Sequence, residues 1–243
     1  MSNVMNKRTI VSRRRALGLL GAAGAALTGA CGGDTPTGPT STSTTTTTTT
    51  TTGATSGTAA TCAVSPNETV GPYPSLSQFV RTDIREDRPG LPLNLTITVV
   101  NANSACAPVA GASVEIWQCD VAGEYSQYGN SRTQTFLRGI QTTNASGQVN
   151  FVTVYPGWYQ GRATHINVEV TANGRSAKVT QIAFPESVNA EVYRSGVYAS
   201  RGLNPTSNTS DGIFADSLSQ EMATVSGNTT SGYNATFQVG ISL

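Results

Sequence analysis

The chain is poor in charge and in histidine. Only 12% of its 243 residues are Asp, Glu, Lys or Arg, and His165 is its one histidine, so a mechanism that needs two histidines is excluded. Five of the 15 basic residues and one of the 14 acidic residues precede position 62, which leaves residues 62–243 with 10 and 13, a formal charge of −3. Without a basic stripe in this part, composition argues against nucleic-acid binding.

The chain also lacks a glycine-rich phosphate-binding loop and an apolar run of the ~20 residues that a membrane span needs. Residues 16–30 carry no charge and follow Arg13, Arg14 and Arg15. A basic segment before a short apolar run is typical of a signal peptide, and paired arginines resemble the twin-arginine signal that exports folded proteins. We predict a twin-arginine-type signal peptide over residues 1–30.

The segment after this leader predicts an anchor and a stalk. Residues 27–31 resemble a lipobox, in which Cys31 would be lipidated after cleavage; ordinary cleavage with release is the alternative. Residues 31–61 are rich in Thr, Ser, Gly and Pro, with threonine throughout 44–52, and have no apolar face to bury. We therefore predict a disordered stalk on an exported protein at the cell surface or in the periplasm, held to the membrane only by its lipid.

Three further cysteines are Cys62, Cys106 and Cys119. One disulfide and one odd thiol are expected in an exported protein. The sequence does not say which pair forms, although Ser104 and Pro108 indicate that Cys106 lies in an exposed loop and favour it as one partner.

Residues 62–243 predict one all-β domain. Residues 93–99 alternate between apolar and polar, the period of a half-buried strand. Glycine-containing turns separate such runs, and the best helix candidate, residues 187–194, is short. Similar runs occur at 113–117, 149–154, 166–170, 179–184 and 235–241. Several short strands of this kind predict a β-sandwich of mostly antiparallel strands with long loops and few short helices.

The stretch 155–167 is the densest in unusual residues, since it holds two tyrosines, a tryptophan, an arginine and the only histidine. His165, Asn167 and Glu169 alternate with apolar residues on a predicted strand, so their side chains leave the same face. We expect this polar face to point to a cleft or to solvent. By itself a lone histidine on a strand is more often a surface or hydrogen-bonded residue than a metal ligand.

The body resembles the intradiol ring-cleavage dioxygenases, the non-haem ferric enzymes that include protocatechuate and catechol dioxygenases, and most of all their small exported bacterial members. The matching segments run in order and cover most of residues 62–216. They are residues 68–73 (Glu-Thr-Val-Gly-Pro-Tyr), 81–84, 90–93, 108–112, 117–125, 136–141, 155–165, 180–184 and 211–214. The resemblance implies Fe(III), a small aromatic diol and O2 as reactants, and insertion of oxygen between the two hydroxyl-bearing carbons to give a muconate-type diacid.

In that family two tyrosines and two histidines hold the iron. By resemblance Tyr125, which follows a Trp-x-x-Asp-x-x-Gly turn, is the first tyrosine, and Tyr159 is the second, with Tyr155 as the alternative. His165 matches the first residue of the family's His-x-His pair, and Asn167 stands where the second histidine would be.

The resemblance also assigns residues to the substrate. Arg162 and Gln181 would line the substrate site, where Arg162 would steady charge that develops on the ring. Tyr159 would be the ligand that the substrate displaces, and it would accept a catechol proton.

Asn167 is the departure from the family pattern. Ferric iron prefers anionic oxygen, which tyrosinates supply. An amide in place of an imidazole keeps the charge balance but has a shorter reach, so we expect weakened iron binding. The main hypothesis is an exported intradiol dioxygenase. The alternative is a surface-anchored module that binds aromatic or polysaccharide-bound ligands and has lost turnover. A purely structural surface domain is a third hypothesis.

Overall fold

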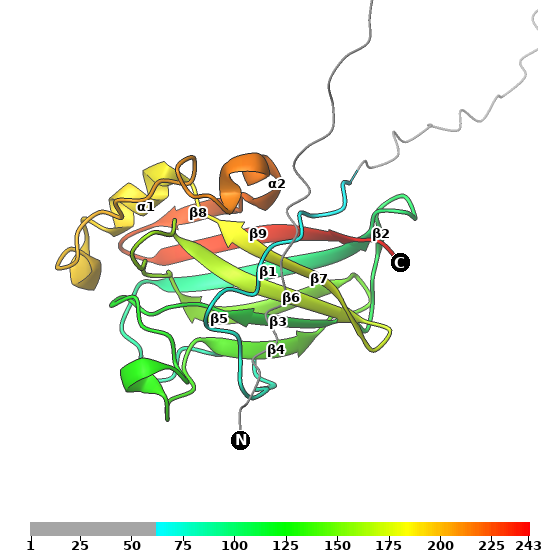
Figure 1. Ribbon diagram of the computed structural model, residues 1–243, viewed down its shortest axis with the longest axis horizontal. Coiled ribbons are helices and arrows are strands. Elements are labelled where there is room, and N and C mark those ends of the chain that lie inside the picture. Colours follow the sequence, from blue (N-terminus) through cyan, green and yellow to red (C-terminus); the bar gives the residue numbers. More distant parts are fainter. Residues whose placement is uncertain (1–61) are drawn as a thin grey trace, which may run out of the picture. The chain divides into compact units, whose positions relative to one another are not determined.

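Two β-sheets make up most of the protein in the computed structural model, which describes residues 62–243 (Figure 1). The predicted signal peptide, the lipidation site Cys31 and the stalk lie outside the described residues. The strands are mostly antiparallel, the helices are few and short, and long loops connect them. The predicted all-β sandwich is therefore confirmed.

The first sheet is built around β1 (Pro92–Asn101). It pairs antiparallel with β5 (Gln148–Val154) and with the two-residue β2 (Ala107–Pro108). On its other side it pairs in parallel with β9 (Gly232–Ile241), which in turn pairs antiparallel with β8 (Thr224–Asn228). A strand from the end of the sequence therefore lies beside the first strand of the fold.

The second sheet has the order β4-β3-β6-β7, with every pair antiparallel. Its strands are β3 (Ser113–Trp117), β4 (Arg138–Thr142), β6 (His165–Ala172) and β7 (Arg175–Ala183). The helices are α1 (Glu186–Val192), α2 (Leu218–Glu221) and three single 3₁₀ turns at Gly129–Ser131, Gly196–Tyr198 and Phe214–Asp216. The site described below is built on this second sheet.

The core follows from the period-two alternation of the strands. In β1 the even-numbered Asn94 and Thr96 face outward, while the apolar side chains between them are buried. The side chains that meet between the sheets include Leu93, Leu95, Ile97, Val114, Ile116, Ile166, Val168 and Ile182. Burying this apolar surface is the main stabilising contribution to the sandwich.

An extended segment before β1 crosses the outer face of the second sheet (Figure 1). We call residues 67–81 the roof segment. Its Glu68 amide donates to the Val179 carbonyl of β7 at 2.8 Å, and its Phe79 carbonyl accepts from the Ile140 amide of β4 at 2.8 Å. The segment therefore spans all four strands. Of the polar face that was expected to point to a cleft or to solvent, His165 and Asn167 are buried, whereas Glu169 is half-exposed.

One disulfide joins Cys62 to Cys106, and Cys119 is a buried free thiol. The prediction of one disulfide and one free cysteine among these three is confirmed, and Cys106 is one partner of the bond, as the sequence favoured. The bond ties the chain before the roof segment to the turn after β1. Burial raises the pKa of the Cys119 thiol to about 12, so this sulfur stays protonated and unreactive.

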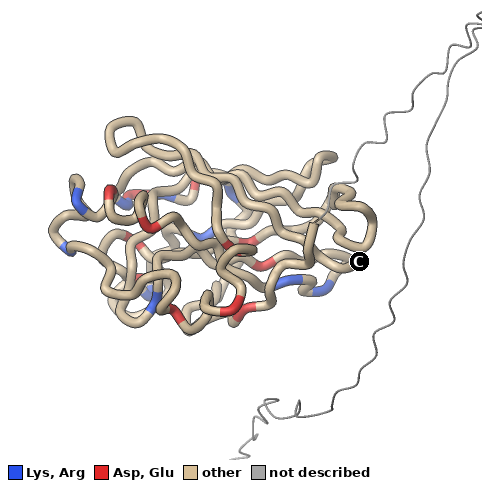
Figure 2. The backbone as a smooth tube through the Cα atoms, turned by 90° about the horizontal axis from the view of Figure 1, so that it is seen from above, with Lys and Arg blue, Asp and Glu red and all other residues tan. Residues whose placement is uncertain are grey.

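Charges of both signs are interspersed along the described chain (Figure 2). Most of the ion pairs are local, such as those of Arg81 with Glu86 and Arg85 with Asp83. No helix among residues 62–243 combines the length and the apolar character that a bilayer span requires.

Candidate metal centre

Tyr125 is positioned by a tight turn that follows β3. The Asp120 carboxylate accepts hydrogen bonds from the backbone amides of Ala122 and Glu124, at 2.9 and 3.0 Å. Gly123 supplies the positive φ of +81° that the turn requires. The chain therefore reverses at a fixed point and directs the Tyr125 ring back over the second sheet.

His165, the first residue of β6, is buried and held in one tautomer. Its Nδ1 lies 2.7 Å from the carbonyl oxygen of Ala163, and because a carbonyl only accepts, Nδ1 carries the hydrogen. The Nε2 lone pair is then available on the other side of the ring. Burial and, to a smaller extent, the nearby Arg162 charge together lower the pKa of His165 to about 4, so the imidazole is neutral at pH 7.

Two of the predicted tyrosines converge on this ring. The Tyr125 hydroxyl lies 3.4 Å from His165 Nε2. The Tyr159 ring lies nearly perpendicular to both neighbours, with its centroid 5.7 Å from that of Tyr125 and 5.6 Å from that of His165. Tyr155, the alternative second tyrosine, instead packs in the core and donates to Asn189 at 2.7 Å. The structure therefore brings Tyr159, and not Tyr155, to the histidine.

Both phenols are protonated in this environment. Burial raises the pKa of Tyr125 well above 10, and it also raises the pKa of Tyr159, against which the Arg162 charge acts. A buried phenolate is costly unless a positive charge accompanies it. Deprotonation of these side chains is therefore coupled to the arrival of a cation.

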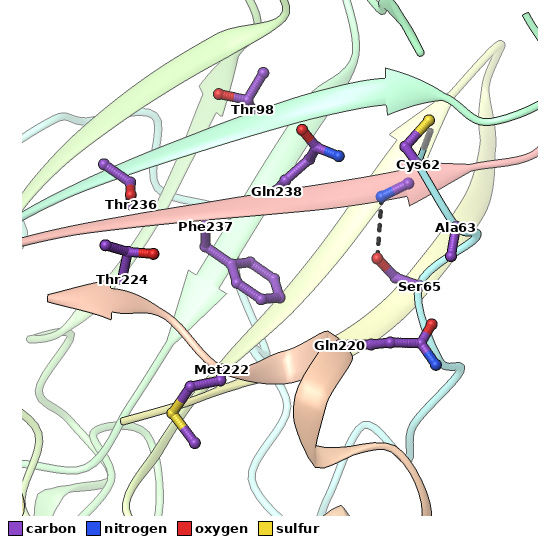
Figure 3. Close-up of a pocket in the computed structure, with 11 residues that line it drawn as sticks. Cys62, Ala63, Ser65, Thr98, Gln220, Met222, Thr224, Thr236, Phe237 and Gln238 are labelled. Carbon is purple, nitrogen blue, oxygen red and sulfur yellow. Dashed lines mark hydrogen bonds between the residues drawn. The ribbon is translucent and has the colours of Figure 1, made fainter. Parts of the chain in front are cut away.

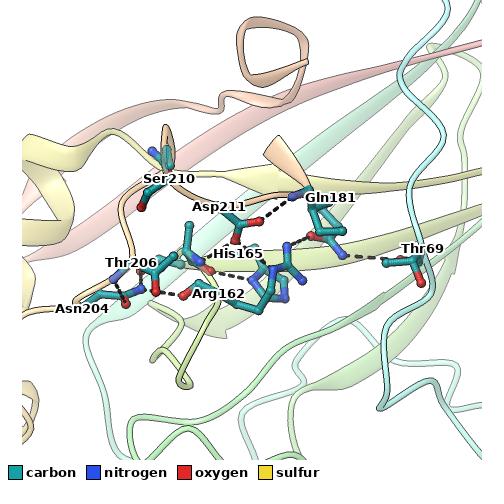
Figure 4. Close-up of polar contacts among 12 residues, drawn as sticks. Thr69, Arg162, His165, Gln181, Asn204, Thr206, Ser210 and Asp211 are labelled. Atoms are coloured by element: carbon teal, nitrogen blue, oxygen red, sulfur yellow. Dashed lines mark hydrogen bonds and ion pairs between the residues drawn. The ribbon is translucent and has the colours of Figure 1, made fainter. Parts of the chain in front are cut away.

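A relay of hydrogen bonds that starts from Asp211, Arg162 and Gln181 (Figure 4) fixes the orientation of Asn167. A guanidinium only donates, so the Gln181 oxygen faces Arg162 and the Gln181 amide nitrogen faces the Asn167 oxygen, at 3.1 Å. The Asn167 nitrogen then donates to the Trp117 carbonyl at 3.1 Å and to the Tyr125 hydroxyl at 3.3 Å. Asn167 therefore presents hydrogen-bond donors, and not its oxygen, to Tyr125.

Asp211 anchors the other end of this relay; sequence reasoning placed it within a matching segment but assigned no role to it. Its carboxylate accepts from Arg162 Nε at 2.8 Å and from the Ala163 amide at 2.6 Å. Burial alone would raise its pKa, but the amides of Ala163 and Ile213 and the Arg162 charge together hold that pKa below its usual value. Arg162 is therefore held in place by a carboxylate that stays ionised.

Aromatic side chains form a second apolar cluster outside the sandwich core. Trp117, Cys119 and Tyr125 are its buried members, and Tyr73, Tyr128 and Tyr159 pack against them. Tyr73, from the roof segment, stacks on Tyr125 with the ring centroids 4.6 Å apart. Sequence reasoning quoted Tyr73 within a matching motif but assigned no role to it or to Tyr128. The positions of these tyrosines in the sequence do not show which aromatic rings they contact in the fold.

A cavity of about 200 Å³ opens beside this cluster. Its lining residues are Tyr73, Gly123, Glu124, Tyr125, Tyr128, Gly129 and Asn130. Pockets for drug-sized ligands are roughly 300–1,000 Å³, so this one suits a single ring.

A larger cavity of about 450 Å³ lies elsewhere, between β9, β8 and α2 (Figure 3). Hydroxyl, amide and apolar groups such as Thr236, Gln238 and Met222 line it, and no acid or base does. It therefore lacks the groups that ring cleavage would need.

The donor set fits a ferric ion with three protein ligands. The Tyr125 phenol oxygen meets the imidazole nitrogen of His165, and the Tyr159 ring packs against both. A metal-binding histidine commonly donates its other N–H to a carbonyl, as His165 does to Ala163. Asn167 fits less well as a fourth ligand, because its oxygen is turned to Gln181. Within residues 62–243 no three His, Cys, Asp or Glu side chains are grouped so that they could hold a metal, so any metal here depends on the tyrosines.

Comparisons with known proteins agree with this geometry. The family model described as Dioxygenase matches residues 71–201, more than half of the chain. A catechol 1,2-dioxygenase from Candida albicans is 33% identical over 108 residues, which cover 35% of this chain and 36% of that protein. The chain thus matches about a third of the length of this curated relative.

Two solved structures are matched over nearly their whole length. An intradiol ring-cleavage dioxygenase from Tetranychus urticae is 33% identical, with a TM-score of 0.67 over 74% of this chain and 95% of that chain. The dioxygenase domain of a carbohydrate-binding fusion protein from Streptomyces sp. SirexAA-E is 28% identical, with a TM-score of 0.58 over 74% and 99%. Sequence, fold and the convergence of tyrosine and histidine agree, and the chain belongs to the intradiol ring-cleavage dioxygenase family.

Proposed function

We propose that the protein binds Fe(III) through Tyr125, Tyr159 and His165 and cleaves catechol-type rings with O2 between the two hydroxyl-bearing carbons. The observation that carries this proposal is the 3.4 Å approach of the Tyr125 hydroxyl to the lone-pair nitrogen of His165. The Tyr159 ring packs against the rings of both Tyr125 and His165. The product would be a muconate-type diacid.

Bound iron would supply a Lewis acid and template that make a chelated catechol reactive toward O2. The protein supplies the surroundings. Tyr73 and Tyr128 offer aromatic walls to a single ring, in the cavity of about 200 Å³ beside Tyr125. Tyr159 is half-buried and lies near Arg162, so, once a bound cation has made it a tyrosinate, it is the side chain best placed to accept a proton from an entering catechol.

Arg162 and Gln181 act as positioning groups in this proposal. Arg162 forms an ion pair with Asp211 and donates a hydrogen bond to the Gln181 oxygen. Because both contacts hold the guanidinium in place, its positive charge stays beside the site without side-chain reorganisation. The roof segment excludes water from the same face, which strengthens electrostatic interactions there.

The test is iron reconstitution of the purified protein. We expect a visible absorption band from tyrosinate-bound iron, about one iron per chain, and O2 consumption with catechol. Tyr125→Phe should lose the band and at least 100-fold of the activity, since it removes an anionic ligand. Tyr128→Phe is the matched control, because its hydroxyl donates to Pro74 instead, at 2.7 Å. A colourless wild-type protein after reconstitution would end the enzyme proposal.

Asn167→His separates the enzyme from the binding-module alternative. The substitution adds an imidazole at the family's fourth ligand position, so iron affinity and turnover should rise. A coloured wild-type protein that consumes no O2 with catechols would favour the binding module. Iron content and O2 uptake measure the two properties independently.

We also propose that the protein is exported and lipid-anchored through Cys31. The support is the sequence pattern of residues 1–31. Incorporation of labelled palmitate into the wild type, and its absence in Cys31→Ser, would support the anchor. Equal labelling of both would contradict it.

A further inference from the structure

A groove of about 460 Å³ lies behind the turn that carries Tyr125 and shares no residue with the proposed iron site. Its walls are mostly apolar and include Pro89, Val121 and Val197, of which Val197 is 49% exposed. Two arginines, Arg88 and Arg201, also line it, together with Asp120, whose carboxylate is already paired with Arg88 and with the amides of Ala122 and Glu124. An apolar groove with few polar groups is the usual form of a small-molecule site.

The two arginines differ in how they are partnered. Arg88 pairs with Asp87 at 2.9 Å and with Asp120 at 3.5 Å. Among residues 62–243, Arg201 is the one half-buried arginine whose guanidinium has no hydrogen-bond acceptor; its Nε is buried and unpartnered. A guanidinium carries five donors and no acceptor, so Arg201 leaves a set of charged donors unused beside the groove.

The position of Arg201 is nevertheless fixed. Its guanidinium lies 4.3 Å from the ring centroid of Trp158, and the Trp158 ring is held by its own hydrogen bond to the Gly202 carbonyl at 3.1 Å. A side chain at Gly123 would place its Cβ 2.6 and 2.8 Å from the two terminal nitrogens of Arg201. The glycine therefore leaves the space that the guanidinium occupies, and the donors are preorganised.

We propose that this groove binds a small carboxylic acid with an apolar body, such as a single-ring aromatic acid. The carboxylate would accept from the Arg201 guanidinium, and the ring would lie against Val121, Val197 and Pro89. Inorganic anions would lack the apolar contacts. This inference goes beyond the proposed function, because it needs neither iron nor a catechol.

Benzoate is the probe, titrated into the metal-free full chain by calorimetry and by tryptophan fluorescence. Trp158 is the useful reporter, since the other tryptophan, Trp117, is buried in the aromatic cluster. We expect a Kd on the order of 1 mM or tighter. Benzamide, which has the same shape without the charge, should bind at least 10-fold more weakly.

Two variants test the assignment independently of folding. Arg201→Gln should weaken benzoate binding by about 10- to 100-fold, as expected for loss of a hydrogen bond to a charged group. Val197→Glu adds a negative charge at an exposed wall position and should also abolish binding. Val80→Glu, which is 84% exposed and outside the groove, and Arg194→Gln, an exposed arginine outside it, should change nothing.

Several outcomes would overturn the proposal. They are no benzoate binding, equal binding of benzamide, displacement of benzoate by equimolar inorganic phosphate, or loss of binding in Arg162→Gln instead of Arg201→Gln, which would place benzoate in the iron site. Because the titration uses metal-free protein, its failure leaves the iron proposal untouched, and the failure of iron binding leaves this one untouched.

Discussion

The outer faces of the two sheets carry similar uncharged polar residues, but those of the first sheet are exposed to solvent and those of the second are buried. On the first sheet Asn94, Thr96 and Asn234 face solvent, and they hydrogen-bond only across strands, as in the 3.1 Å pair of Asn94 and Asn234. On the second sheet Asn167 and Gln181 also face outward from paired positions, but they are buried. Both faces carry uncharged amides on alternating positions.

The difference between them is the cover. The roof segment crosses the second sheet and brings Tyr73 onto Tyr125, whereas the grid of Asn, Thr and Gln on the first sheet stays open. Burial makes each amide hydrogen bond costly to leave unmade, and so it orients Gln181 and Asn167. A strand pattern alone therefore does not make a site; a second segment that removes water from it does.

The largest effect on stability should come from removing the disulfide that tethers the chain just before the roof segment. Cys106→Ser removes the bond to Cys62, which closes a 44-residue separation, and loop-closure entropy predicts a loss of about 4 kcal/mol. Thermal or urea unfolding under non-reducing conditions measures it. Reconstituted Cys106→Ser should also lose iron faster to a chelator. A variant as stable as the wild type would show that the roof segment needs no tether.

The next prediction compares one amide on each face. Asn167→Leu removes the donor to the Trp117 carbonyl and leaves the buried Gln181 amide with only its long 3.4 Å bond to the Thr69 carbonyl, so it should destabilise the protein by about 2–4 kcal/mol. Asn234→Leu on the open face should stay within about 0.5 kcal/mol. Urea unfolding of both variants tests the contrast, and equal losses would contradict the role assigned to the cover.

A pH effect is expected at the edge of the covered sheet. Glu221 of α2 is fully buried, and burial raises its pKa to about 7, while the Ser217 hydroxyl acts in the opposite direction. The folded protein thus holds this proton more tightly than the unfolded chain, so its contribution to stability is complete below about pH 4.5 and is lost as pH rises toward 7.

Glu221→Gln removes this loss. The variant should be more stable than the wild type by about 1–2 kcal/mol at pH 8 and equal to it near pH 4. Thermal unfolding across this range measures the difference, with the exposed Glu191→Gln as control. A gain that does not vary with pH would mean that packing, and not titration, is responsible.

The smallest expected effects on stability come from replacing threonine with valine at one buried and one exposed position. Thr180 is fully buried, and its hydroxyl has no hydrogen-bond partner, so Thr180→Val should stabilise the fold by about 1 kcal/mol. Thr236→Val on the open face should change stability by less than about 0.5 kcal/mol. Matched melting curves distinguish them, and a destabilised Thr180→Val would show that the hydroxyl is satisfied.

The sequence predicted what depends on local pattern. The alternation at 93–99 became β1, residues 113–117 became β3, and the short helix predicted at 187–194 appears as α1. It did not predict β4, because Arg138 is a buried charge inside that strand, or β8, because Thr224–Asn228 has almost no apolar residue to alternate.

The site was predicted only as far as the family resemblance reached. Tyr125, Tyr159 and His165 were assigned by motif, and the structure brings them together. The roof segment has no periodic pattern, so nothing local indicated that it would cover the sheet. The contact of Tyr73 with Tyr125 and that of Asp211 with Arg162 join residues 52 and 49 positions apart, which spacing cannot reveal.

The parallel pairing of β1 with β9 has a consequence for synthesis. Leu93 is paired with Tyr233, so the first sheet cannot form its central pair until residues 232–241 have left the ribosome. Contacts between such distant residues are slow to form, because the loop must close before any pairing compensates for it. The growing polypeptide therefore carries β1 and β5 with an unpaired edge while residues 155–231 are made, and a chaperone that shields β1 during that interval would speed its maturation.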